Sequence, residues 1–411
     1  MFSSSELHTL FTHEMSRRDF LLDTAAVGSL AALGLSPTSF AQENTIDTSS
    51  VRIGYLPISD ATALLVADAY EFFQQQGLKV DKPTPVKSWS ELIIGFLSGK
   101  FNLVHLLNPI PIWLRYNHGI PIKVTSWAHV NGSAILVGEH TGVEHVHQLA
   151  RKQIAVPYWY SIHNILLQMI LRQAGLTPVI KNKYEPLAEK EVNLQILPPP
   201  LMVSALELGN IDAFIVAEPI NAKGELVAKG KILRFTGDVW KNHPCCVICM
   251  HEQLTTQQPE WVQKVTNALV QAQVYTQKNC AEVAQTLSNS GKSYIPVPEN
   301  VLKHAMMSYD ATHYASPQAI LHQQTWGNGR IDFYPWPYPS ATRLLVEAMK
   351  KTLVGNQVKN TFLNTLEPNF VAEDLVDYRF VKLSMENYMD WETVPGVDLK
   401  NPYAREEIIA I

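Results

Sequence analysis

Two segments of the chain present the same landmarks in the same order. Residues 97–109 read LSGKFNLVHLLNP, and residues 206–219 read LELGNIDAFIVAEP. In each segment a polar residue follows the glycine by three positions and a proline follows it by ten. Glycine accepts the left-handed conformation that ends a helix, and proline interrupts a strand. Each segment therefore predicts a helix, a buried strand and a break at the strand's carboxyl end, where open α/β sheets bind ligands.

Strands and helices alternate from residue 51 onward. An apolar strand is expected at 51–55 and a second at 78–80, with the helix between them ending at Gly77. Ser88 and Glu91 have the spacing of a capping box at the start of an apolar helix. Any helix that ends at a glycine before a strand would show part of this repeated pattern. The polar residue three positions after each glycine and the proline ten positions after it nevertheless favour duplication. We therefore predict an α/β protein of two similar lobes with mainly parallel sheets joined by a hinge.

The composition limits the partners of this chain. It is 46% hydrophobic and 17% charged, with a net charge of -5 and no polybasic block, so nucleic acid is not an expected partner. No nucleophile elbow, Walker loop, dinucleotide fingerprint or paired-cysteine zinc motif is present. We accordingly predict no catalytic residue, no cofactor and no resident metal.

The N-terminal residues have the pattern of an export signal. Arg17 and Arg18 precede an apolar stretch at 22–35, and small residues follow at Ser39 and Ala41. The paired arginines predict the twin-arginine route, with a signal over residues 1–41; a short buried helix is the alternative. No later segment is apolar enough to span a membrane. We expect a periplasmic protein, free after cleavage or tethered to the membrane by an uncleaved signal.

A cysteine-rich segment, HPCCVIC, covers residues 243–249, and Cys280 lies apart from it. Adjacent cysteines form strained disulfides, so this is not a disulfide framework. In a strand, Cys245 and Cys249 would share one face and Cys246 would point to the other, which argues against a three-thiolate metal site. The simplest interpretation is apolar packing. A thiol in a ligand cleft and a soft-metal or redox role remain open.

Several motifs resemble one protein family in order along the chain. They are GYLPISDA from Gly54, KSW from Lys87, NPIP from Asn108, PPPLMV from Pro198, GNIDAF from Gly209, EP at Glu218 and WKNHP from Trp240. They resemble the nitrate/bicarbonate-binding proteins, within the nitrate, sulfonate and taurine receptors of ABC importers. The resemblance covers roughly residues 50 to 280. It implies the type II periplasmic-binding-protein fold, with a solute held between hinged lobes.

The resemblance also implies a set of ligand-binding residues. In that family an anion contacts the Trp of the Ser-Trp motif, an amide after the fourth strand and a His that opens a helix of lobe two, here Trp89, Asn131 and His163. A lysine of the His-Pro motif falls on Cys246, which departs from the family because a cysteine supplies neither a full positive charge nor hard-metal ligation. We complete the predicted set with Leu56, Ser59, Ser133, Ser161 and Glu218.

Each of these residues also has a structural interpretation. Trp89 at a helix start can cover the core, His163 can be an ordinary buried histidine, and Asn131 can form a plain turn. An oxyanion would gain from the free N–H groups of the helices that begin at Trp89 and His163. For Glu218 a role at the hinge is favoured over contact with a cationic ligand part.

The predicted protein is a monomeric receptor that binds a small anion such as nitrate, or a sulfonate or organic solute. It delivers the solute to an ABC permease and ATPase complex at the inner membrane. The alternative is an enzyme or binder that resembles thiamine-pyrimidine synthases, whose fold is related. The expected organisation is a signal at 1–41, lobe one at 50–143, lobe two at 144–240, a return to lobe one with a helical region at 241–364, and an extension without assigned role at 365–411. A long amphipathic helix is expected from Pro259.

Overall fold

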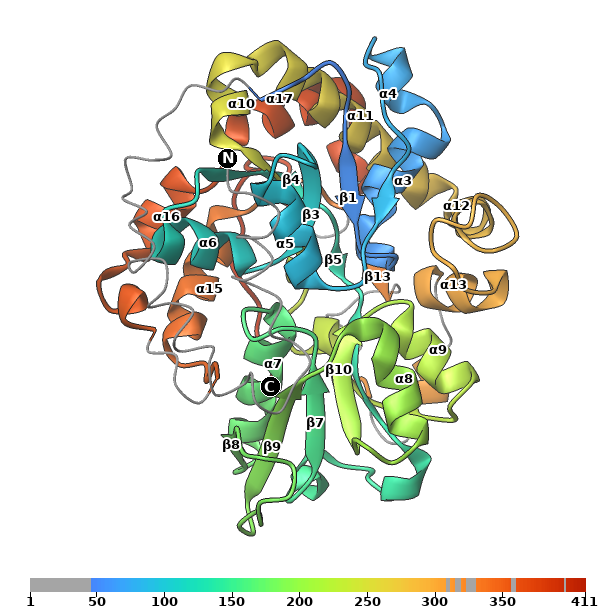
Figure 1. Ribbon diagram of the computed structural model, residues 1–411, viewed down its shortest axis with the longest axis vertical. Coiled ribbons are helices and arrows are strands. Elements are labelled where there is room, and N and C mark those ends of the chain that lie inside the picture. Colours follow the sequence, from blue (N-terminus) through green and yellow to red (C-terminus); the bar gives the residue numbers. More distant parts are fainter. Residues whose placement is uncertain (1–45, 308–310, 315–318, 323–329, 356–359, 395–396) are drawn as a thin grey trace.

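The protein consists of two α/β lobes (Figure 1). The computed structural model describes residues 46–307, 311–314, 319–322, 330–355, 360–394 and 397–411. The predicted export signal lies outside these residues. Among the described helices, none has the length and apolar character needed to cross a membrane.

The sheet of lobe one has the strand order β2-β1-β3-β12-β4. Its strands are β1 (Ile53–Tyr55), β2 (Thr84–Pro85), β3 (Leu103–Leu107), β4 (Ile122–Trp127) and β12 (Cys246–His251). Strand β1 runs parallel to β2 and β3, whereas β12 runs antiparallel to β3 and β4. The second strand, β2 at 84–85, lies later in the chain than the predicted strand at 78–80. Residues 78–80 contribute only an isolated bridge from Val80 to Val51.

The sheet of lobe two has the order β11-β6-β10-β7-β9-β8. Its strands are β6 (Ser133–Val137), β7 (Gln153–Val156), β8 (Thr177–Val179), β9 (Glu191–Ile196), β10 (Ala213–Ala217) and β11 (Lys231–Phe235). Only β6 is antiparallel to its neighbours β10 and β11. In the direction β9-β7-β10-β6-β11, this order matches the lobe-one order β2-β1-β3-β12-β4 strand by strand. Strand β10 takes the place of β3, and the antiparallel β6 takes the place of β12. The matching order supports the predicted duplication.

The repeated sequence segments occupy these equivalent places. Gly99 ends the helix before β3 with a φ of 75°, and Gly209 ends the helix before β10 with a φ of 65°. Pro109 and Pro219 each follow a cis peptide bond at the far end of the strand. The helices of the two segments are α5 (Trp89–Leu97), α6 (Ile110–His118), α8 (Pro199–Glu207) and α9 (Ile220–Leu226).

The helix predicted to run to Gly77 is interrupted. It is divided into η2 (Ser59–Ala61), α3 (Thr62–Ala69) and α4 (Phe72–Gln75), with Glu71 in the left-handed region at a φ of 60°. The predicted cap of α5 is confirmed, since the Ser88 hydroxyl accepts the N–H of Glu91 at 3.1 Å.

Further helices connect the lobes and cover their outer faces (Figure 1). The predicted amphipathic helix is α11 (Pro259–Lys278), and its apolar side packs on α3 and α17. The other helices and turns are α7 (Ile162–Gln173), α10 (Glu252–Gln257), α12 (Cys280–Leu287), α13 (Glu299–Met306), α15 (Pro339–Lys350), α16 (Pro368–Asp374), α17 (Tyr378–Tyr388), η3 (Glu139–Thr141), η4 (Val146–Leu149), η5 (Thr236–Asp238), η6 (Ala311–Tyr314), η7 (Thr361–Thr365) and η8 (Trp391–Thr393). A short sheet of β5 (Val130–Asn131) and β13 (Ile331–Asp332) completes the fold.

Candidate functional site

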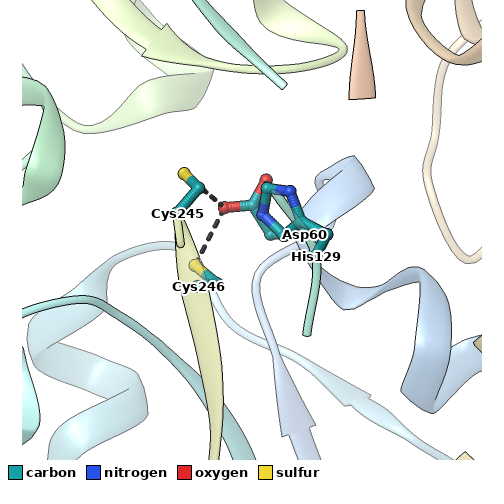
Figure 2. A group of neighbouring side chains, drawn as sticks. All are labelled: Asp60, His129, Cys245 and Cys246. Carbon is teal, nitrogen blue, oxygen red and sulfur yellow. Dashed lines mark hydrogen bonds and ion pairs between the residues drawn. The ribbon is translucent and has the colours of Figure 1, made fainter. Parts of the chain in front are cut away.

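Four side chains meet at one edge of the lobe-one sheet: Asp60, His129, Cys245 and Cys246 (Figure 2). Asp60 lies in η2 after β1, and His129 follows β4. Cys246 is the first residue of the antiparallel β12, and Cys245 directly precedes it. The carboxyl ends of β1 and β4 and the amino end of β12 therefore converge here. All four residues have no exposed surface.

Asp60 is the centre of this cluster. The Cys246 thiol donates to Asp60 Oδ2 at 2.9 Å, and the Cys245 Sγ lies 3.7 Å from the same oxygen (Figure 2). The His129 Nε2 lies 3.3 Å from Asp60 Oδ1. The four residues can each direct one ligand atom into a region in which these atoms lie within 4.8 Å of one another.

Burial and mutual contact shift the titration of the cluster. Burial opposes protonation of His129, but the Asp60 carboxylate and Cys245 outweigh it and raise the pKa of His129 to about 10. Burial raises the pKa of Asp60, and the charge of His129 partly opposes this. Burial and the neighbouring Cys245 and Asp60 raise the pKa of Cys246. At neutral pH the cluster thus contains an imidazolium beside a carboxyl group and at least one protonated thiol.

Lobe two contributes two polar side chains to the same place. Ser133 begins β6, and His163 lies in the first turn of α7, whose N-terminus is capped by the Ser161 hydroxyl accepting from the N–H of Asn164 at 3.1 Å. Ser133 Oγ lies 2.8 Å from His163 Nε2 and 3.5 Å from Cys245 Sγ. His163 Nε2 lies 3.8 Å from Cys245 Sγ. These contacts join the two lobes.

Trp89 and Leu56 approach this region through His105, a residue of β3 that the sequence reasoning did not single out. The Leu56 N–H donates to His105 Nε2 at 3.0 Å. The rings of Trp89 and His105 pack edge to face with their centroids 5.4 Å apart. Burial and the charge of His129 lower the pKa of His105 to about 3, so its ring is neutral. Within the described part of the chain, the buried Trp89 Nε1 and the Ser59 hydroxyl have no hydrogen-bond partner.

Asn131 and Glu218 are already engaged by protein groups. Asn131 has a φ of 57° in β5, and its Nδ2 donates to Asn242 Oδ1 at 3.3 Å. Glu218 Oε1 accepts from Arg330 Nε at 2.9 Å, and its Oε2 accepts the N–H of Ala222 at 3.0 Å. The favoured structural interpretation of Glu218 agrees with this geometry, and its role in ligand binding stays a prediction.

The expected orientation of Cys245 is wrong, whereas Cys246 and Cys249 are separated as expected. We expected Cys246 to point away from Cys245 and Cys249 because side chains alternate along a strand. The strand begins only at Cys246, so Cys245 lies outside the alternation and both thiols reach Asp60. Cys249 remains buried within β12, outside the cluster, as apolar packing predicts.

The sequence reasoning also missed Asp60, His129 and Cys245 as site residues. Asp60 lies inside η2. The available signal was positional, because Asp60 and His129 each follow a strand of the same sheet at its carboxyl end. For the cysteine-rich segment the sequence left a thiol in a ligand cleft and a soft-metal role open, but no local pattern indicated contact of Cys245 with Asp60.

Known proteins resemble the chain over most of its length. The NMT1-like family model matches residues 44–288. The nitrate/nitrite binding protein NrtA of Nostoc is 24% identical over 372 residues, which cover 80% of this chain and 81% of that protein. The nitrate import ATP-binding protein NrtC of Synechocystis is 27% identical over 248 residues, which make up 56% of this chain and 36% of that relative.

A solved structure confirms the predicted fold. The periplasmic nitrate-binding protein NrtA from Synechocystis superposes with a TM-score of 0.68 at 17% identity, covering 87% of this chain and 97% of that one. The two-lobed periplasmic-binding-protein fold and the resemblance to nitrate-binding proteins are thereby both borne out. Since the family model spans more than half of its residues, the chain belongs to the NMT1-like family.

Proposed function

We propose that this protein is the exported solute receptor of an ABC importer and that it closes its two lobes on a small anion such as nitrate. The observation that carries the proposal is the meeting of polar side chains from both lobes at one buried place. His129 reaches it from lobe one, and Ser133 and His163 reach it from lobe two. A solute that contacts both lobes stabilises the closed state, so the closed conformation distinguishes a loaded binding protein from an empty one.

Donor groups at this place suit an anion even though position 246 is a cysteine. The imidazolium of His129, whose pKa is raised to about 10, supplies a positive charge that the Asp60 carboxylate partly balances. The Trp89 indole N–H, a donor, and His163 Nδ1 are buried without a partner among the described residues. Trp89 and His163 also lie in the first turns of α5 and α7, whose N–H groups favour an anion. His129 thus supplies the positive charge that the resemblance assigns to a lysine at position 246.

The relatives support the choice of solute and partners. Nitrate and nitrite are the ligands named for the Nostoc relative, and the other relative is an ATP-binding protein of nitrate import. We propose delivery to a permease and ATPase complex at the inner membrane, export by the twin-arginine route and a monomeric receptor. The complete burial of the cluster favours a solute of few atoms over a large organic one.

Thermal-shift measurements with nitrate, nitrite, bicarbonate with calcium, sulfonates and thiamine precursors test this function. A ligand that binds only the folded chain stabilises it by about 2.7 kcal/mol at a hundredfold excess over its Kd. Trp89→Phe removes one indole N–H and should weaken the response to the anion. Trp261→Phe is the matched control, because Trp261 Nε1 is also buried without a partner in the described structure but lies in α11.

The outcomes separate the candidate functions. A shift with one oxyanion that Trp89→Phe reduces and Trp261→Phe leaves unchanged supports the anion receptor. A shift only with a thiamine precursor would favour the thiamine-related alternative. An anion response that both variants retain in full contradicts the site assigned to Trp89.

A further inference from the structure

The cluster of Asp60, His129, Cys245 and Cys246 has more donor atoms than its internal contacts use. Asp60 Oδ1 and both ring nitrogens of His129 make no hydrogen bond within the described structure, and only the 3.3 Å ion pair joins the two residues. Both residues are completely buried. Buried polar atoms without partners are costly, so a ligand that satisfies them together would stabilise this place.

We propose that these four residues bind a thiophilic divalent metal ion of the Zn²⁺ class. The Oδ atoms of Asp60, a ring nitrogen of His129 and the Sγ atoms of Cys245 and Cys246 provide one oxygen, one nitrogen and two sulfur ligands. Four ligands of these types form the tetrahedral sites that zinc prefers. A calcium or magnesium ion would instead require six or more oxygen ligands.

The spacing of the donor atoms agrees with such an ion. Zinc lies about 2.3 Å from sulfur and about 2.0–2.2 Å from nitrogen and oxygen, so tetrahedral donors lie about 3.3–3.8 Å apart. In the cluster, Asp60 Oδ2 lies 3.7 Å from Cys245 Sγ, within this range, and 2.9 Å from Cys246 Sγ, below it. All four ligand atoms lie within 4.8 Å of one another, so shifts of about 1 Å bring them to tetrahedral separations.

Binding of the metal exchanges protons for the ion. The thiol protons that Cys245 and Cys246 direct at Asp60 and the imidazolium proton of His129 leave to solvent as the four ligand bonds form, because the metal binds two thiolates and a neutral imidazole. No electron is transferred, and the ion keeps its charge of two. Affinity for the metal should therefore increase with pH.

All four ligands belong to lobe one, whereas Ser133 and His163 of lobe two lie against Cys245. An ion can accordingly bind to lobe one while the lobes are open and be covered by lobe two on closure. This part of the inference rests on the proposed solute receptor with moving lobes. The metal binding itself does not depend on that function.

The test uses the full chain, reduced and freed of metal with a chelator. Zn²⁺ is titrated in competition with a chromophoric chelator, and Co²⁺ is added separately because its spectrum reports tetrahedral geometry and thiolate ligation. We expect one Zn²⁺ per chain and a Co²⁺–thiolate charge-transfer band. The double variant Cys245→Ala/Cys246→Ala should abolish the band and weaken Zn²⁺ binding by more than about 100-fold, beyond the effect of changing an outer-shell partner.

Cys249→Ala is the matched control, because it removes a buried thiol of the same strand outside the cluster. Should the double variant fail to fold, His129→Gln removes a single ligand and tests the same claim. Absence of stoichiometric Zn²⁺ binding, or binding that both cluster variants retain, overturns the proposal. A nitrate response of the metal-free chain is measured in parallel, so that failure of the metal site and failure of the anion receptor are seen separately.

Discussion

Replacing Arg330 by methionine should lower the free energy of unfolding by about 3–5 kcal/mol, because it leaves buried carboxylates without their counter-charge. The Arg330 side chain has no exposed surface, and that of Glu218 is 1% exposed. Arg330 Nε donates to Glu218 Oε1 at 2.9 Å, and its Nη1 donates to Glu225 Oε2 at 2.7 Å. Solvent cannot replace the guanidinium at this depth, so little of the loss is recovered by hydration.

The loss should depend on pH with a defined sign. Burial raises the pKa of Glu218, and the charge of Arg330 opposes that shift. Without Arg330 the folded pKa of Glu218 rises further above its unfolded value, so the folded chain binds the proton more readily. The deficit of the variant is therefore largest at pH values above the folded pKa, and it shrinks as the pH falls through the folded pKa toward the lower unfolded value.

Urea unfolding of wild type and variant at about pH 8 and about pH 5 measures both effects. Arg379→Met is the control, because the Arg379 side chain is 65% exposed where it pairs at 2.7 Å with Asp377, which is 9% exposed. Such a pair contributes about 0–1 kcal/mol. A deficit for Arg330→Met no larger than for Arg379→Met, or one that does not shrink at the lower pH, would refute the reasoning.

Three further substitutions test local features. Gly54→Ala places a Cβ 2.2 Å from the ring of Phe101 and should lower the free energy of unfolding in urea by about 1–3 kcal/mol. Phe101→Leu in the same chain should reduce this additional loss, and an unchanged loss would show that the ring is not its cause. Ser88→Ala removes the cap of α5 and should cost about 1 kcal/mol, seen as a lower melting temperature. His105 has a folded pKa of about 3 through burial, below its ordinary 6.5, so acid favours the unfolded chain between these values. His105→Gln should therefore melt with a weaker pH dependence across this window, and an unchanged dependence would contradict the assignment.

The parts of the fold that local chemistry determines were predictable from the sequence. Ser88 caps α5 because its hydroxyl reaches an N–H three residues later, and Pro259 begins α11 because a first-turn proline loses no hydrogen bond. The second strand was misplaced, because Leu78 and Val80 are apolar whereas Thr84 and Pro85 have no strand pattern, and only pairing with β1 makes them the strand. Glu71 likewise interrupts a helix that its sequence would continue.

The candidate site depends on contacts that no local pattern contains. Asp60 and Cys246 lie 186 positions apart in the chain, and they meet because β12 inserts between β3 and β4. The orientation of Cys245 depends on where that strand begins, and an error of one residue reverses the predicted face. His105 was hidden for a different reason, since a histidine within the apolar β3 has no sequence signature of a polar contact.

The two proposals for this place constrain each other through charge. In the metal-free cluster, His129 carries a positive charge that can attract an anion. A bound Zn²⁺ would take the His129 lone pair, and three anionic ligands around a dication leave one net negative charge. A four-coordinate ion of this kind has no open position for nitrate. Zn²⁺ should therefore weaken nitrate binding, and nitrate must weaken Zn²⁺ binding by the same factor, because coupling free energies are reciprocal.

Titration calorimetry of each ligand in the presence of the other measures both factors. Independent binding would show that the anion does not use His129, and stronger nitrate binding with Zn²⁺ would show that the ion keeps an open position.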